Sequence, residues 1–253
     1  LRSGLGSTGD AQGDTLSGIE NLIGSAYDDR LYGDDSANVL MGGAGHDLFD
    51  GRGGADVIDG GTGDFNTVTY ETRGAAIVVD LAEGTASDGD RLVNISNVIG
   101  TSFADRLTGD AGSNQIYGGD GADVLDGGAG ADRLAGGNGT DLVSYVSSDA
   151  AVIVDVSAGT ASGEGDILVD IEGAIGSIFN DTILAGNGFS LANGYSGDDL
   201  LYASQDGGSD FFGDYGVDTI HFGLARQGVV VDLASSVTNR LDRVYEIENV
   251  IGS

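Results

Sequence analysis

Residues 118–135 read GGDGADVLDGGAGADRLA, which is two consecutive copies of a nine-residue unit. Each copy begins with two glycines and has an aspartate at its sixth position and an apolar residue, Leu125 or Leu134, at its eighth. Six glycine-rich residues permit a tight turn with positive φ angles and exposed carbonyls, and the last three form a very short strand with one side chain pointing inward. The unit therefore predicts a stack of short strands joined by turns.

New units begin at regular nonapeptide intervals through much of the chain. The predicted unit starts are Gly24, Gly33, Gly42, Gly51, Gly60, Gly100, Gly109, Gly118, Gly127, Gly136, Gly176, Ala185, Gly194 and Gly213, with an irregular stretch at 205–210. The predicted inward side chains are Leu31, Leu40, Phe49, Ile58, Leu107, Ile116, Leu125, Leu134, Val143, Ile183, Leu201, Phe212 and Ile220. The absence of proline agrees with this prediction, because stacked parallel strands need their backbone donors.

A second, longer period is superimposed on the first. The phrase IENLIGS at 19–25 returns at one constant interval, as ISNVIGT at 95–101, IEGAIGS at 171–177 and IENVIGS at 247–253. A fixed long period is typical of stacked architectures, in which each unit covers its neighbour's apolar face. We predict the tail of a preceding module at 1–18, three 76-residue modules at 19–94, 95–170 and 171–246, and the start of a further module at 247–253.

The nonapeptide has the form G-G-x-G-x-D-x-U-x, where U is apolar, and the whole chain resembles the RTX, or haemolysin-type calcium-binding repeat, family of type I secreted bacterial proteins. Segments of the form V-D-L-x-x-G-T-A, followed by I-E-N-V-I-G-S, look like modules of long secreted and cell-surface proteins of this kind. The resemblance implies an all-β fold, a parallel β-roll or β-helix solenoid in which two nonapeptides complete one coil. It also implies a chain that stays unfolded inside the cell and folds outside with calcium.

The charge balance limits the partners of the chain. Forty-one acidic residues and 10 arginines, with no lysine, produce a formal net charge of -31, and such self-repulsion destabilises a compact state unless a cation neutralises it. The missing basic footprint argues against nucleic acid and anionic membranes as partners. No apolar run reaches the length of a membrane span, so we expect no membrane insertion. Without cysteine there are neither disulfides nor thiolate metal sites.

Sixth-position residues that stand two units apart would face one gap between neighbouring coils. The pairs are Asp29 with Asp47, Asn38 with Asp56, Asp105 with Asp123, Asn114 with Asp132, Asp123 with Asp141, Asp181 with Asp199 and, one position further apart, Asp199 with Asp218. Turn carbonyls around Gly42, Gly51, Gly100, Gly118, Gly127, Gly136 and Gly194 complete the predicted metal sites. A hard cation that takes six to eight oxygens suits such gaps, and calcium suits them better than magnesium. We expect several Ca²⁺ ions and folding on binding, although aspartate also occurs as a simple turn former.

The linking segments contain β-branched runs at 68–86, 143–161 and 220–233. We predict that they form longer strands in slightly wider coils of an uninterrupted solenoid. Asp80, Asp155 and Asp232 each follow three consecutive β-branched residues inside these segments and could be additional ligands, but solvent-facing strand ends are the favoured interpretation.

The sequence shows no catalytic constellation. His46 and His221 are accompanied by no serine or cysteine nucleophile pattern, and the lysine of a phosphate-binding loop is absent. We therefore predict a protein segment that is not an enzyme: a calcium-binding β-roll of a secreted or cell-surface protein, located outside the cell. It would act as a structural spacer or an assembly or adhesion surface, with other copies of the array as a further partner. The alternative is an accessory module that binds acidic polysaccharide for an enzyme such as a mannuronan C5-epimerase or lyase.

Overall fold

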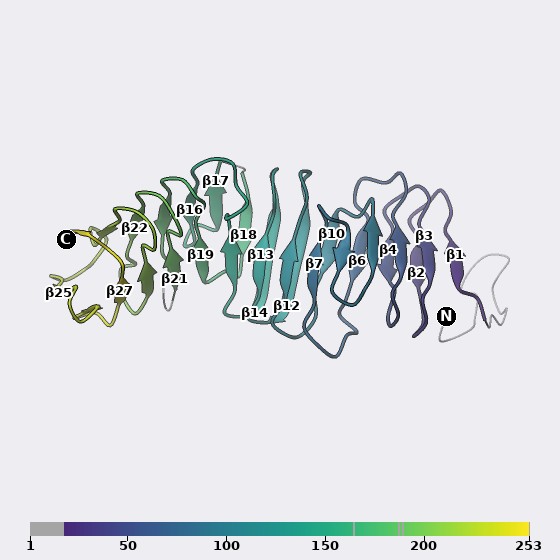
Figure 1. Cartoon of the computed structure of the whole chain (residues 1–253), viewed down its shortest axis with the longest axis horizontal. Helices are drawn as coiled ribbons and strands as arrows, with labels where there is room; N and C mark the ends of the chain where they lie inside the picture. Colours follow the sequence, from purple (N-terminus) through teal and green to yellow (C-terminus); the bar gives the residue numbers. More distant parts are fainter. Residues whose placement is uncertain (1–17, 164, 187, 189, 253) are drawn as a thin grey trace.

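The computed structural model describes residues 18–163, 165–186, 188 and 190–252. The predicted tail of a preceding module lies outside the described residues except for Gly18. The described residues form an elongated solenoid of short strands, whose coils follow the sequence from one end to the other (Figure 1). They contain strands but no helix, and so none that could cross a membrane. The predicted all-β fold class, a parallel β-roll, is confirmed.

The strands lie in two sheets. The 15-stranded sheet contains, in spatial order, β1 (Asn21–Ile23), β3 (Val39–Met41), β5 (Val57–Asp59), β9 (Arg91–Val93), β8 (Thr85–Ala86), β7 (Val78–Asp80), β11 (Arg106–Thr108), β13 (Val124–Asp126), β15 (Leu142–Ser144), β19 (Gly173–Ile175), β21 (Leu191–Asn193), β23 (Asp210–Phe212), β27 (Arg243–Tyr245), β26 (Val237–Thr238) and β25 (Val231–Asp232). The 13-stranded sheet contains β2 (Arg30–Tyr32), β4 (Leu48–Asp50), β6 (Thr67–Thr69), β10 (Asn97–Ile99), β12 (Gln115–Gly121), β14 (Arg133–Gly139), β18 (Ile167–Val169), β17 (Thr160–Ser162), β16 (Ile153–Asp155), β20 (Thr182–Leu184), β22 (Leu200–Tyr202), β24 (Thr219–His221) and β28 (Asn249–Ile251).

Successive coils pair in register. Leu40 pairs in parallel with Ile58, two nonapeptide units further on, and Leu107 pairs with Leu125 across the same interval. Stacked turns come so close that a Cβ on Gly43, which has a φ of 104°, would overlap the carbonyl oxygen of Ser25 on the preceding coil. Glycine at the second position of the unit is therefore required by both the backbone angle and the close approach.

The core consists of inward side chains from both sheets, one row from each, which fill the space between the sheets. Of the thirteen predicted inward residues, eleven are fully buried and Leu31 is half-buried. Phe212 is a wrong prediction, because Gly213 opens the next turn and makes Phe212 the outward ninth residue of its unit. Its ring stacks on Tyr245 outside the sheet, with the centroids 4.9 Å apart, while Phe211 is fully buried in the core.

The linking segments differ from the prediction. Instead of wider coils, they form antiparallel three-stranded insertions: β7 pairs antiparallel with β8, and β8 pairs antiparallel with β9. The chain passes from β6 to β7, three strands ahead of β5, and returns through β8 to β9, beside β5. Gly84 lies between β7 and β8 and Gly89 between β8 and β9, and their φ angles of 68° and 103° permit these reversals.

The insertions alternate between the two sheets. β7 to β9 and β25 to β27 belong to the 15-stranded sheet, whereas β16 to β18 belong to the 13-stranded sheet. Each complete insertion gives its sheet two strands more than the opposite sheet has, which adds roughly 10 Å to one side at a strand spacing of about 4.8 Å. Consecutive insertions therefore bend the solenoid in opposite directions. The boundaries of the three long modules remain a prediction.

Two neighbouring residues of β18 allow a test of which side chains point into the core and which point outward. Leu168 is 5% exposed and Ile167 is 52% exposed. We expect Leu168→Ala to lower the free energy of unfolding by about 2–5 kcal/mol, because it leaves a cavity in the core. Ile167→Ala should change it by less than about 0.5 kcal/mol. Urea denaturation followed by circular dichroism in one buffer measures both, and equal losses would contradict the assignment.

Candidate metal centres

Each sixth-position residue lies at the end of a turn, directly before a strand. One row of turns leads from the 15-stranded to the 13-stranded sheet and carries Asp29, Asp47, Asn114, Asp132, Asp181, Asp199 and Asp218. The opposite row carries Asn38, Asp56, Asp105, Asp123 and Asp141. All of these side chains are buried except that of Asp29, which is half-buried. The predicted site residues therefore form two ladders of buried carboxylates and amides, one along each side of the solenoid.

A backbone hydrogen bond joins the two members of each predicted pair. The N–H of Asp105 donates to Oδ1 of Asp123 over 2.7 Å, and the N–H of Asp123 donates to Oδ1 of Asp141 over 2.8 Å. The same bond joins Asp29 to Asp47, Asn38 to Asp56, Asn114 to Asp132, Asp181 to Asp199 and Asp199 to Asp218. One oxygen of each second member is thus used to align the coils, and the other is left for a different partner.

The second carboxylate oxygen is the unusual feature of these ladders. Within the described part of the chain, Oδ2 is buried and has no hydrogen-bond partner in Asp47, Asp56, Asp123, Asp141, Asp199 and Asp218. A buried carboxylate oxygen without a donor or a cation is strongly unfavourable, and native proteins rarely leave one so. Six equivalent instances along two ladders point to a ligand that these oxygens share.

Backbone carbonyls converge on the same places. A Cβ on Gly118 would overlap Oδ2 of Asp123 and come within 2.7 Å of the carbonyl oxygen of Gly136, one coil further on. The carbonyls of Gly42, Gly51, Gly118, Gly127 and Gly194 lie in the same way over the first-position glycine of the preceding coil. Gly100 lies under the carbonyl of Gly118 and beside Oδ2 of Asp105. The space that a side chain would fill is therefore lined by carboxylate and carbonyl oxygens.

This donor set suits a hard cation. No group of three or more His, Cys, Asp or Glu side chains able to hold a metal converges among the described residues, so backbone carbonyls would have to supply the remaining ligands. Carboxylates combined with turn carbonyls are the ligands that calcium takes in flexible geometry, whereas zinc prefers nitrogen and sulfur. The residues present fit calcium on chemical grounds.

Three of the predicted ligands have Oδ2 satisfied by the protein. Oδ2 of Asp29 accepts the Ser25 hydroxyl over 2.9 Å and the Ser25 backbone N–H, and Oδ2 of Asp105 accepts the Thr101 N–H over 2.6 Å. Oδ2 of Asp181 accepts the hydroxyl and the backbone N–H of Ser177. In two of the three, Oδ1 is bonded as well, because that of Asp105 accepts the Ile77 N–H and that of Asp181 accepts the Val152 N–H. At these three positions the protein itself supplies donors to Oδ2, unlike at the six positions described above.

The ladders also contain residues that the sequence pattern did not reveal. Asn66, Asp90, Asp166, Glu172, Asp242 and Glu248 accept the backbone N–H groups of Asp47, Asp56, Asp132, Asp141, Ser209 and Asp218, respectively. A signal for three of them was present, because Asp90, Asp166 and Asp242 each stand two positions before an apolar residue, like the sixth and eighth positions of the unit. The insertions separate these three from their partners by far more than the two nonapeptides of an ordinary coil.

Asp80, Asp155 and Asp232 belong to tight turns rather than to the ladders. Oδ1 of Asp80 accepts the Glu83 N–H, and Oδ1 of Asp155 accepts the Ala158 N–H, both over 2.8 Å. Oδ1 of Asp232 accepts the Ala234 N–H over 3.0 Å. These carboxylates cap the reversals inside the insertions, which explains their recurrence without a metal.

Burial makes the ladder carboxylates poor anions in the absence of a cation. It raises the pKa of Asp123 to about 6, with the charges of Asp105 and Asp141 adding to the effect, although the hydrogen bond from Asp105 opposes it. Burial likewise raises the pKa of Asp199 to about 7, helped by Asp181 and Asp218. The pKa values of Asp56, Asp141, Asp181 and Asp218 are also raised, chiefly by burial. Burial and mutual repulsion therefore disfavour the ionised form of the ladder carboxylates when no cation is bound.

The two histidines make contacts that do not resemble a catalytic arrangement. The ring of His46 packs edge-on against Phe65, with the centroids 5.3 Å apart. Nδ1 of His221 accepts the Gly223 N–H over 2.8 Å, and the ring stacks on Tyr202. Each contact accounts for the side chain as part of the outer surface.

A comparison with known proteins finds one family. A family model that spans four copies of the RTX calcium-binding nonapeptide repeat matches residues 14–49, 32–64, 99–134, 108–143 and 175–211, which together make up more than half of the chain. No curated protein matches the chain at a significant level.

The raised pKa values predict an unusual pH dependence for the metal-free chain. Asp titrates at about 3.9 in an unfolded chain, and burial raises the pKa of Asp123 to about 6 and that of Asp199 to about 7 in the folded one. A raised carboxyl pKa stabilises the fold below the unfolded pKa, and this contribution is lost as the pH rises through the folded pKa. We expect β structure in metal-stripped buffer to decrease between pH 5 and 8.

Far-ultraviolet circular dichroism in EDTA measures this dependence. The range lies above the sequence isoelectric point of about 4.1, which keeps the chain negatively charged throughout. Asp123→Asn removes one titrating group and should flatten the profile, and Asp149→Asn, at an exposed turn, is the control. A gain of β structure with rising pH would contradict the burial argument.

Proposed function

The chain belongs to the family of RTX calcium-binding nonapeptide repeats, and from this premise we propose that it is a non-catalytic structural segment that folds by binding several Ca²⁺ ions. The proposed ligands are the predicted residues of the two ladders together with turn carbonyls of the first-position glycines. The observation that carries the proposal is the set of six buried Oδ2 atoms without a hydrogen-bond partner among the described residues. Four of them, in Asp47, Asp123, Asp141 and Asp218, lie with a backbone carbonyl oxygen around the space over a first-position glycine.

The residues of the chain prepare this binding. Backbone N–H groups hold Oδ1 of each second member, so that Oδ2 faces the gap between coils. Glycine at the first position leaves that gap open, because any Cβ there would meet the carboxylate. When bound, Ca²⁺ supplies positive charge and oxygen coordination to groups that otherwise repel one another. Strand pairing is thereby coupled to metal binding, since the site does not exist in the unfolded chain.

We further propose that the chain works outside the cell as a spacer or an assembly surface. The family occurs in type I secreted bacterial proteins, and extracellular calcium is abundant enough for sites with dissociation constants of about 0.1–1 mM. Support for the spacer role comes from the extended stack in Figure 1 and from insertions that oppose each other's bend. Other copies of the array are candidate partners for assembly.

The polysaccharide-binding alternative has less support. A groove of about 650 Å³ runs beside β10, β12 and β14, and the acidic residues in its lining are Glu71, Asp120 and Asp170. No basic side chain is among the described residues that line it, and the adjoining groove of about 500 Å³, which shares Glu71 and Asp170 with it, adds a single arginine, Arg133. An acidic polysaccharide would meet like charge there, so it would need a cation between the two.

A calcium titration tests the proposed function. We expect a change from coil towards β structure at roughly 0.1–1 mM calcium, reversed by a chelator, with little change in magnesium because magnesium demands stricter octahedral geometry. Far-ultraviolet circular dichroism follows both titrations. Complete β structure in chelator would contradict the proposal. The ladder residues would then be buried turn residues of a solenoid that folds without metal.

Asp123→Asn tests a single ladder position. The amide keeps an oxygen for the Asp105 N–H but places a donor where Oδ2 faces the gap. We expect the calcium midpoint to rise by roughly tenfold or more, as for the loss of a supporting metal contact. Asp149→Asn removes the same charge from an exposed turn and should leave the midpoint nearly unchanged. Equal shifts in both variants would indicate a net-charge effect instead.

A further inference from the structure

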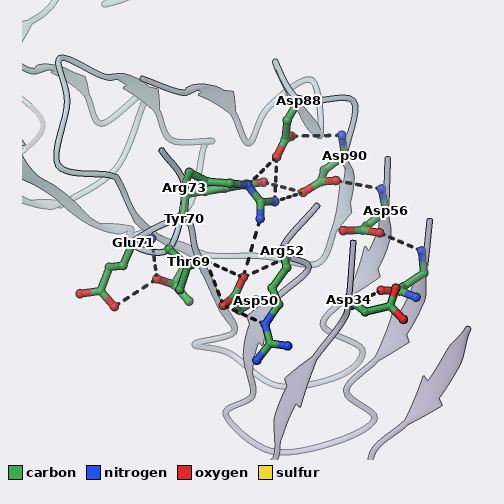
Figure 2. Close-up of polar contacts among 12 residues, drawn as sticks. Asp34, Asp50, Arg52, Asp56, Thr69, Tyr70, Glu71, Arg73, Asp88 and Asp90 are labelled. Atoms are coloured by element: carbon green, nitrogen blue, oxygen red, sulfur yellow. Dashed lines mark hydrogen bonds and ion pairs between the residues drawn. The ribbon is translucent and has the colours of Figure 1, made fainter. Parts of the chain in front are cut away.

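The insertion in the first predicted module ends a ladder in an unusual way. Asp90 is 2% exposed and takes the place above Asp56, whose N–H donates to its Oδ1 over 2.8 Å. Whereas Oδ2 of Asp56 has no hydrogen-bond partner in the described structure, Oδ2 of Asp90 accepts the Tyr70 hydroxyl over 3.3 Å. It also lies 3.6 Å from Nη2 of Arg73 (Figure 2). The chain itself therefore provides a cation at this position.

Arg73 joins three carboxylates from two separate parts of the chain. Its Nε and Nη2 donate to Oδ2 of Asp88 over 3.1 and 2.8 Å, and its Nη1 lies 3.9 Å from Oδ1 of Asp50. The guanidinium also lies over the ring of Tyr70, 5.3 Å from the centroid. Asp50 ends β4, whereas Asp88 and Asp90 belong to the turn between β8 and β9. The guanidinium thus links the insertion to the coil on which it packs.

The insertion in the third predicted module repeats the arrangement with a different arginine. Oδ2 of Asp242 accepts the Thr238 hydroxyl over 3.1 Å and lies 3.8 Å from Nε of Arg240. The Arg240 guanidinium lies over the ring of Phe222, which stands in the sequence where the first insertion has Tyr70. Arg73 follows the aromatic residue by three positions, but Arg240 precedes the ladder aspartate by two. The same place is therefore filled from two different points of the sequence.

These ion pairs differ from ordinary surface salt bridges, which contribute little. The side chain of Arg73 is 15% exposed and that of Asp90 is fully buried, and the Arg240 side chain is 9% exposed against a fully buried Asp242 side chain. Removing one partner of such a pair leaves an uncompensated buried charge. A planar guanidinium suits the place because it bonds carboxylates with two nitrogens and stacks on aromatic rings at the same time.

We propose that Arg73 and Arg240 are built-in counter-ions, which hold the first and third insertions on the solenoid without calcium. The proposal rests on the proposed function in that the turns need calcium, whereas these two junctions do not. In the calcium-free chain the segments at 70–93 and 222–245 then keep local structure, and the neighbouring coils add to them when calcium is supplied. The two arginines divide the ladders into metal-dependent and metal-independent parts.

Hydrogen exchange of the full chain, read by mass spectrometry in chelator, tests this division. We expect peptides covering 77–93 to be protected in the wild-type chain, because exchange reports the local opening of each segment. Arg73→Met should raise their exchange rates by roughly tenfold or more, since the carboxylates then lack a counter-charge. Arg91→Met is the matched control, because Arg91 lies in the same insertion but is exposed, and it should leave the rates unchanged.

Arg240→Met supplies a second, independent case, read from peptides covering 231–245. Wild-type peptides without protection in chelator, or an Arg73→Met variant with wild-type rates, would overturn the inference. Failure of the proposed function appears elsewhere, as turn peptides at 100–126 whose exchange does not respond to calcium. The two failures are therefore read from different peptides of the same experiment.

Discussion

The structure depends on one repeated contact, in which a buried carboxylate accepts the backbone N–H of the residue that holds the same place on the preceding coil. This contact aligns strands that are too short to specify their own register and that give each coil few inward side chains. The glycines that allow such close stacking carry a high conformational entropy in the unfolded chain. A carboxylate that is charged, buried and not neutralised destabilises its coil, so the contacts of the second oxygen bear directly on the stability of that coil.

The chain supplies a partner to that second oxygen in two ways and leaves it without a protein donor in a third group of residues. At Asp29, Asp105 and Asp181 it supplies a backbone N–H, and a Ser or Thr hydroxyl binds the same carboxylate. At Asp90 and Asp242 it supplies a hydroxyl and a guanidinium. Elsewhere, six of the ladder aspartates are left without any protein donor to Oδ2 in the described structure. The aspartates of the first group recur at one constant interval, which places them between ladder aspartates whose Oδ2 has no protein donor in the described structure.

The sequence predicted the parts of this arrangement that repeat at short intervals. Glycine spacing and the aspartate before each apolar residue indicated the coil length and the ladder pairs, because stacking preserves an interval of two nonapeptides. It did not predict the insertions, since β-branched runs favour a strand without stating whether its neighbour is parallel or antiparallel. Asp90 and Asp166 were missed for the same reason, as the antiparallel reversal separates them in sequence from the residues that they contact. Arg73 carries no local signal, and only the fold shows that it meets Asp88 and Asp90.

The antiparallel insertions alternate between the two sheets, so the bends that they introduce oppose one another. A nonapeptide stack that carried its additional strands always on one sheet would curve steadily towards the other sheet. Successive insertions instead fall on alternate sheets, because the units between two insertions carry the chain across the solenoid an odd number of times. The period thus sets the direction of each bend as well as its position. An array of this kind stays extended over many modules, provided that successive modules keep the same number of nonapeptides between insertions.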